Sequence, residues 1–80
     1  MKLGASLPVG VSPADAKRAA FGAAFTAWMA EAGLASTDIR TLCSVSAPTV
    51  AQWRSGRALP SEQHLHTLER AGFRVPQEAA

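Results

Sequence analysis

Arginine and hydroxyl side chains gather in the middle of this 80-residue chain, and their chemistry suits the binding of phosphate groups. No acidic residue occurs between positions 39 and 61, whereas Arg40, Arg54 and Arg57 all fall inside this window. Guanidinium groups bind phosphate through several N–H donors, and hydroxyl groups add further hydrogen bonds. The whole chain has a formal charge of only +2, so the local placement of charge, more than its total, favours a nucleic acid as partner.

Three residues could ligate a soft metal ion or serve as nucleophile and base: Cys43, His64 and His66. A structural zinc site needs four ligands, and two histidines at positions i and i+2 of a helix point away from each other. Cys43 falls on the apolar side of its predicted helix, where a thiol behaves as a small hydrophobic group. We therefore expect no metal, no cofactor and no enzymatic activity.

Length and composition predict one small globular domain. The chain is 48% apolar and 18% charged, and we expect an alanine-rich core without room for a separate ligand-sensing domain. A single cysteine cannot form an internal disulfide. The first eleven residues are too short, and too interrupted by Gly and Pro, for a signal-peptide core or a membrane span. These features predict a soluble protein of the cytoplasm with no membrane partner.

Helix start and stop signals predict a first helix over residues 13–32. Ser12, Pro13 and Asp15 occupy the N-cap, the first helical position and the first turn, and Gly33 is suited to a left-handed C-cap. Gly22 is a possible site of bending. A continuous apolar stripe is predicted to consist of Phe21, Phe25, Trp28, Met29 and Ala32.

Two shorter helices follow, with Ser36 and Ser46 as their expected N-caps. Only Ser44 and Val45 separate them, so the two helices must cross at a steep angle, as in a helix-turn-helix, with Val45 filling the corner. Trp28 and Trp53 both lie on apolar stripes, which favours core packing over base stacking. The inward residues are predicted to be Ile39, Leu42, Cys43, Val50 and Trp53.

A last helix is expected after the loop at residues 55–60, with Ser61 as its cap and Gly72 at its end. Leu65, Leu68 and Ala71 are predicted to face inward. No segment has the period of a β-strand. The chain is thus predicted to be an all-α, four-helix domain over residues 12–75, with a flexible arm at residues 1–11 and a flexible tail at residues 76–80.

Residues 45–56, VSAPTVAQWRSG, with Arg57, Leu59, Pro60 and Ser61 after them, resemble the Cro/repressor (XRE-like) helix-turn-helix family. The resemblance covers roughly residues 21–73 and implies a compact lambda-repressor-like domain of four to five helices that binds double-stranded DNA. Three residues depart from the family pattern. Arg40 stands where a small Ala is usual, Ser44 where Gly is usual, and Arg54 where Glu is common.

The resemblance also implies a set of DNA-contacting residues. Base edges would be read by Thr49 and Gln52, with apolar contacts from Ala47 and Pro48, although ordinary surface exposure is the alternative for each. Arg54 could instead pair with an acid such as Glu62, and Arg40 could simply be solvated. The implied phosphate contacts are Arg57, Ser55, Arg54, Ser36, Thr37 and Arg40.

These features favour a sequence-specific DNA-binding transcriptional regulator, a Cro-like repressor or operon autoregulator that binds its operator as a homodimer. Phe73 and Val75 either form the dimer contact or fold back onto the core of the monomer. Lys2 could reach the DNA, or the arm that carries it could be disordered. The alternatives are a protein-interaction module, such as an antitoxin or phage adaptor, and an architectural, excisionase-like DNA binder.

Overall fold

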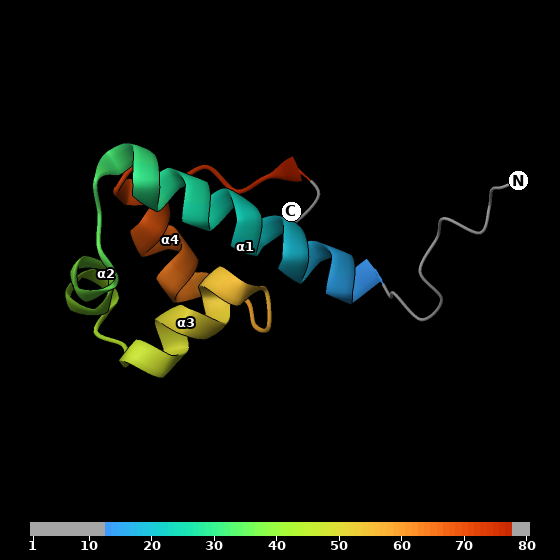
Figure 1. Ribbon diagram of the computed structural model, residues 1–80, viewed down its shortest axis with the longest axis horizontal. Coiled ribbons are helices and arrows are strands. Elements are labelled where there is room, and N and C mark those ends of the chain that lie inside the picture. Colours follow the sequence, from blue (N-terminus) through green and yellow to red (C-terminus); the bar gives the residue numbers. More distant parts are fainter. Residues whose placement is uncertain (1–12, 78–80) are drawn as a thin grey trace, which may run out of the picture.

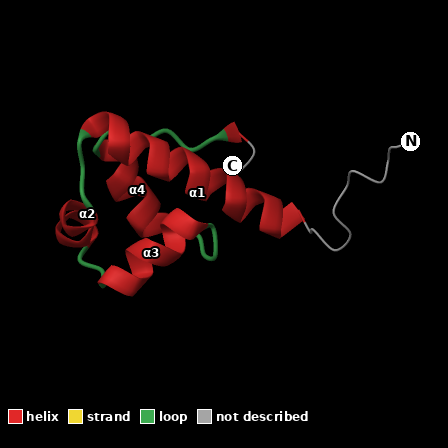
Figure 2. Ribbon diagram, in the orientation of Figure 1, coloured by secondary structure: helices red, strands yellow, loops and turns green. Residues whose placement is uncertain are grey.

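The computed structural model describes residues 13–77, and this part of the chain contains four α-helices (Figure 1). Turns and loops connect them, and this part contains no strand (Figure 2). The prediction of an all-α domain with four helices is confirmed. The predicted arm, with Lys2, and residues 78–80 of the predicted tail lie outside the described residues. The helices are α1 (Pro13–Ala32), α2 (Ser36–Cys43), α3 (Ala47–Ser55) and α4 (Glu62–Arg70).

The first helix, α1, has the predicted bounds, and its predicted N-cap, Ser12, lies outside the described residues. Gly33 adopts the left-handed conformation, with φ of 70°, and the amide of Leu34 donates to the carbonyl of Met29 at 2.8 Å, which closes the helix end. Phe21, Phe25 and Met29 are buried, and Trp28 is half-buried against them. Ala32 is exposed, so the prediction that it continues the stripe is wrong: the buried face ends at Met29.

The second helix, α2, begins at Ser36, which was predicted to be its N-cap, so the helix starts one residue earlier than expected. Ala35 is the N-cap, and its amide donates to the Asp38 carboxylate at 2.8 Å, so Ser36 is the first helical residue and not the cap. Ile39 and Cys43 are buried one turn apart. Leu42 is 43% exposed, contrary to prediction, because it lies about 100° around the helix from Cys43.

The turn between α2 and α3 consists of residues 44–46. Ser44 has φ of 56°, and it is the single non-glycine residue with positive φ in the described part of the chain. Val45 is half-buried against the core, as predicted. Ser46 is the N-cap of α3, but its hydroxyl bonds to the Thr49 hydroxyl at 3.0 Å, and not to a backbone amide as expected. Two α3 residues, Val50 and Trp53, are buried.

The last helix, α4, has the predicted cap, because the Ser61 hydroxyl accepts from the amide of His64 at 3.4 Å. Leu68 is fully buried and Leu65 is half-buried, as expected. Ala71 is exposed, so its predicted inward position is wrong. It is the C-cap of α4 and lies past the last turn that packs on the core.

The segment after α4 returns along α1 (Figure 1) and completes the core. The Phe73 ring is only 3% exposed and lies 5.3 Å from the Phe21 ring and 5.4 Å from the Trp28 ring. Val75 is half-buried on the same core. Of the two alternatives for this segment, the structure adopts the folded-back one. The core is aromatic and not alanine-rich as expected, and its buried residues are Phe21, Phe25, Met29, Ile39, Cys43, Val50, Trp53, Leu68 and Phe73.

Two glycines bring the backbones of α1 and the end of α3 into direct contact. A Cβ atom on Gly22 would lie 2.8 Å from the amide nitrogen of Gly56 and 2.9 Å from the carbonyl oxygen of Arg54. Gly56 has φ of 79°, and a Cβ atom there would lie 3.1 Å from the Cα atom of Ala19. α1 is continuous through Gly22, where a bend was considered, so the absent side chain serves close packing.

Candidate nucleic-acid interface

The outer face of α3 carries a shallow hollow that groups several of the predicted DNA-contacting residues. Val50 and Trp53 anchor the inner face of this helix, which leaves the intervening positions exposed to solvent. The hollow measures about 360 Å³, and none of its lining residues is acidic. Its lining residues are Pro48, Ala51, Gln52, Ser55 and Arg57.

The side chains in this hollow differ in how free they are to bind a ligand. Gln52 is exposed, and its carbonyl oxygen on the backbone accepts both the Arg57 amide at 2.9 Å and the Ser55 hydroxyl at 3.3 Å. The amide group of the Gln52 side chain and the guanidinium of Arg57 have no hydrogen-bond partner within residues 13–77. Both groups can therefore bind an external partner without breaking an internal bond.

Two other predicted base contacts lie at the start of α3. Ala47 is exposed at the first helical position. Thr49 is half-buried, and its hydroxyl already shares a hydrogen bond with Ser46. A base contact through the Thr49 hydroxyl would have to compete with this bond, whereas a contact through its methyl group would not.

A second hollow, of about 400 Å³, adjoins the first and lies between α1 and α3. Ala51 and Ser55 line both hollows, and Thr26 and Arg54 complete the second one. The Thr26 hydroxyl donates to the carbonyl oxygen of Arg54 at 3.4 Å, which ties the middle of α1 to the last turn of α3. Thr26 was not among the predicted site residues. Gly22, four positions earlier on the same face, is the signal in the sequence that this side of α1 packs closely on a neighbouring segment.

Arg54 brings the start of α2 to this surface. Its guanidinium donates to the Ser36 hydroxyl at 3.2 Å, and the predicted alternative partner, Glu62, takes no part in this bond. The first amide groups of a helix lack partners inside the helix. At the start of α2 the Asp38 carboxylate already accepts the amide of Ala35, which leaves the amides of Ser36 and Thr37 as donors in this turn. Two of the predicted phosphate contacts are thus joined in the structure.

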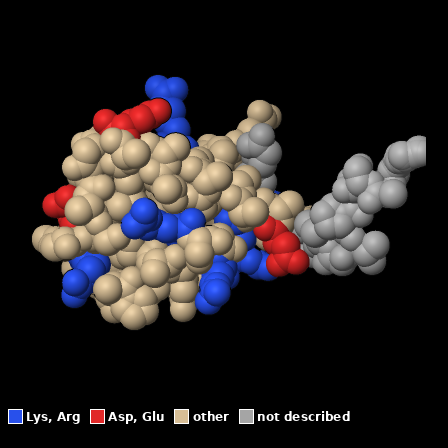
Figure 3. Space-filling model, in the orientation of Figure 1, with Lys and Arg blue, Asp and Glu red and all other residues tan. Residues whose placement is uncertain are grey.

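The remaining predicted phosphate contacts lie on α2, away from the two hollows. Thr37 is exposed, and its carbonyl oxygen accepts the hydroxyl of Thr41 at 3.1 Å. Arg40 is exposed in the last turn of α2 and lines neither hollow. Figure 3 shows basic side chains at the lower edge of the molecule, near α2, α3 and the loop that follows α3, and also in the middle and at the top of this face. Acidic side chains lie at the left, at the top and at the right, where they adjoin a basic group.

The structure also shows where the candidates for base stacking, for nucleophilic chemistry and for metal binding lie. Trp53 is 2% exposed and packs against the rings of Phe25 and His64, so it is not a stacking platform for bases. Burial raises the pKa of the Cys43 thiol through desolvation, which disfavours the nucleophilic thiolate. Within residues 13–77, no three His, Cys, Asp or Glu side chains are grouped so that they could hold a metal ion.

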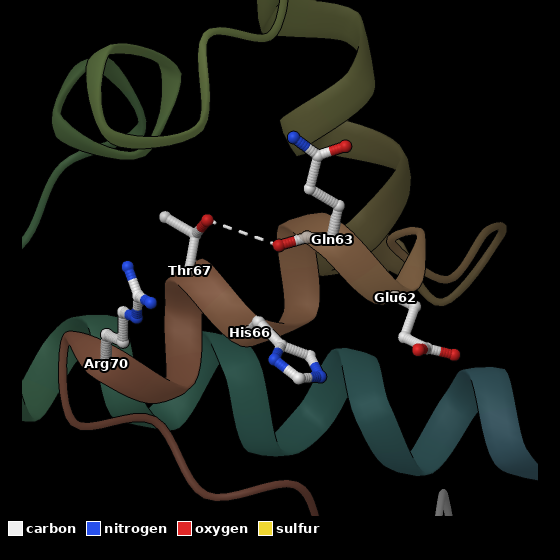
Figure 4. A pocket seen from close by; sticks show the side chains of 5 residues that line it. All are labelled: Glu62, Gln63, His66, Thr67 and Arg70. Atoms are coloured by element: carbon white, nitrogen blue, oxygen red, sulfur yellow. Dashed lines mark hydrogen bonds between the residues drawn. The ribbon is translucent and has the colours of Figure 1, made fainter.

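A larger hollow, of about 560 Å³, lies on the outer face of α4 (Figure 4). It is lined by a single helix, and the Thr67 hydroxyl that faces it already donates to the carbonyl oxygen of Gln63 at 3.2 Å. Glu62 at one end opposes the binding of an anion. This hollow therefore does not match the phosphate chemistry of the α3 face. Its lining residues are Glu62, Gln63, His66, Thr67 and Arg70.

Comparisons of the chain with protein-family models, with curated proteins and with solved structures found no match. Among residues 13–77, none of the helices has the length and apolar character needed to cross a membrane.

Proposed function

We propose that this chain is a sequence-specific double-stranded DNA-binding regulator of transcription, a Cro-like repressor or operon autoregulator of a bacterium or phage. In this proposal α2, the turn at residues 44–46 and α3 form a helix-turn-helix. One observation carries the proposal: the exposed face of α3 groups Gln52, Ser55 and Arg57 around one hollow that contains no carboxylate.

The dimensions of α3 suit the proposed role. An α-helix with its side chains is about 10–12 Å across, so it fits the major groove of B-DNA, which is about 12 Å wide. The nine residues of α3 form about two and a half turns, so several exposed side chains can face the groove. Gln52 would read the edge of an adenine through its amide group, with Pro48 and Ala51 as apolar neighbours that face thymine methyl groups. Val50 and Trp53, on the opposite side, hold this helix rigidly on the core.

Phosphate groups would be held on both sides of the reading helix. Arg57 follows Gly56, whose left-handed conformation directs the chain sharply out of α3. On the other side, Arg54 and the Ser36 hydroxyl form a donor pair at the start of α2. These contacts would fix the position of α3 on the duplex and carry no sequence information themselves.

We propose further that the chain binds its operator as a homodimer in the cytoplasm. One helix-turn-helix contacts too few base pairs for adequate selectivity, and two-fold pairing doubles the site. Phe73 is occupied in the core of the monomer, so a dimer would have to use other surface residues.

Paired substitutions test this proposal in one binding assay. Gln52→Ala should reduce discrimination at one base position per half-site by about 1–3 kcal/mol and leave the salt dependence unchanged. Arg57→Ala should weaken binding to all sequences alike and lower the slope of log affinity against log salt by about 0.9 per subunit. The DNA that flanks the gene for this chain is the first target for footprinting.

Two residues of α4 provide matched controls for this experiment. Gln63→Ala and Arg70→Ala remove the same chemical groups as the two test variants, but from the hollow on α4. Both controls should bind DNA like the wild-type chain. If the α3 variants bind like the wild-type chain as well, the DNA-reading role of α3 is wrong, and co-purification with a protein partner becomes the next experiment.

A further inference from the structure

The N-terminal end of α1 projects past the core and lies beside the end of α3. None of the residues 13–20 is buried, and the first buried residue of the helix is Phe21. Figure 1 shows this end of α1 extending beyond α3 and the loop that follows it. The backbone contact of Gly22 with Gly56 fixes the position of this projection relative to that loop.

The contacts of α1 identify which of its faces is directed toward the end of α3. The position of a Cβ atom on Gly22 and the hydroxyl of Thr26 both lie against the carbonyl oxygen of Arg54. Residues four and seven positions before Gly22 occupy the same face, one and two turns closer to the N-terminus. These residues are Arg18 and Asp15. The carbonyl oxygen of Arg18 lies 3.1 Å from the position of a Cβ atom on Gly56, next to Arg57 in sequence.

The side chains of Arg18 and Asp15 form an ion pair on this face. They are 32% and 51% exposed, so solvent screens the pair and it contributes little to folding stability. The carboxylate does, however, hold the guanidinium close to the surface of the helix. A phosphate group that approached along the α3 face would meet this guanidinium and would have to displace the carboxylate from it.

We propose that Arg18 is an additional phosphate-binding residue, which extends the DNA contact of Arg57 onto α1, and that Asp15 competes with the phosphate for its guanidinium. This inference rests on the proposed DNA-binding function. The competition lowers the affinity of the protein for any duplex, whatever its sequence. Discrimination between sequences is thereby left to the base-reading residues of α3.

The test measures the binding of a mixed-sequence duplex of about 30 base pairs, long enough for two half-sites, between about 50 and 200 mM salt. Arg18→Gln should lower the slope of log affinity against log salt by about 0.9 per subunit. Asp15→Asn should raise the affinity at fixed salt by about two- to fivefold. This gain should shrink in the double variant, because Asp15 acts through Arg18.

Lys17 is the matched control, because it carries the same charge, is exposed and is adjacent in sequence, but lies about 100° around the helix from Arg18. Lys17→Gln should leave the salt slope unchanged. Circular dichroism should show wild-type helicity for all variants. A wild-type slope for Arg18→Gln, or an equal loss for Lys17→Gln, overturns the inference while a reduced slope for Arg57→Ala still supports the proposed function. If the wild-type chain shows no salt-dependent binding, both are wrong.

Discussion

Substitution of Gly22 by alanine would add a Cβ atom 2.8 Å from the amide nitrogen of Gly56 and 2.9 Å from the carbonyl oxygen of Arg54. Favourable contacts with carbon begin at about 3.5 Å, and both of these neighbours are backbone atoms that no side-chain rotation can move. Relief of the clash requires α1 and the end of α3 to move apart. This movement would also loosen the packing of Trp53 in the core.

The expected effect follows from two opposing contributions. Overpacking of a well-packed contact costs about 1–3 kcal/mol, and the rigid neighbours place this site near the upper end of that range. Replacement of Gly by Ala inside a helix returns about 1 kcal/mol through helix propensity. We therefore expect a net loss of about 2 kcal/mol in the free energy of unfolding, and a fall in Tm of about 8–16 °C for a domain of this size.

Thermal and urea denaturation, followed by circular dichroism, measure this loss, and two other glycines separate its causes. Gly33 has φ of 70° with no atom near its Cβ position, so Gly33→Ala should show only the backbone cost of about 1 kcal/mol. Gly56 combines positive φ with close contacts, so Gly56→Ala should lose the most stability. If Gly22→Ala were as stable as the wild-type chain, or more stable, the close approach of α1 and α3 would be refuted.

Three further predictions concern the turn between α2 and α3, the segment that follows α4, and the buried thiol. Ser44→Gly should stabilise the domain by about 0.5–1 kcal/mol in urea denaturation, because Gly adopts positive φ without the strain that Ser44 bears. Phe73→Ala should cost about 3–5 kcal/mol independently of protein concentration, whereas a concentration-dependent loss would indicate that Phe73 acts in a dimer. Because the pKa of Cys43 is raised above its ordinary value of 9.0, the thiol of the unfolded chain ionises first. Stability should thus be retained below pH 9.0 and fall as pH rises above it, and Cys43→Ala should remove this part of the pH dependence.

The sequence alone determined the elements of this fold, because caps and periodicity are local signals. Pro13 and Gly33 delimit α1 and Gly56 ends α3 through their backbone preferences, and the Ser61 hydroxyl caps the start of α4. The separation of Val50 and Trp53 from the exposed residues of α3 likewise follows from the period of one helix. For the same reason, the sequence alone predicted which residues of α3 belong to the candidate site.

The tertiary structure decided what depends on contacts between distant segments. The local pattern does not indicate that Phe73 enters the core, because the segment after α4 is extended and has no helical periodicity from which an inward face could be predicted. The contact between Gly22 and Gly56, and the bond from Arg54 to Ser36, join residues 34 and 18 positions apart. Such contacts depend on which helices pack together, at what distance and at what angle. Those quantities result from the packing of all four helices around one core, and no single segment encodes them.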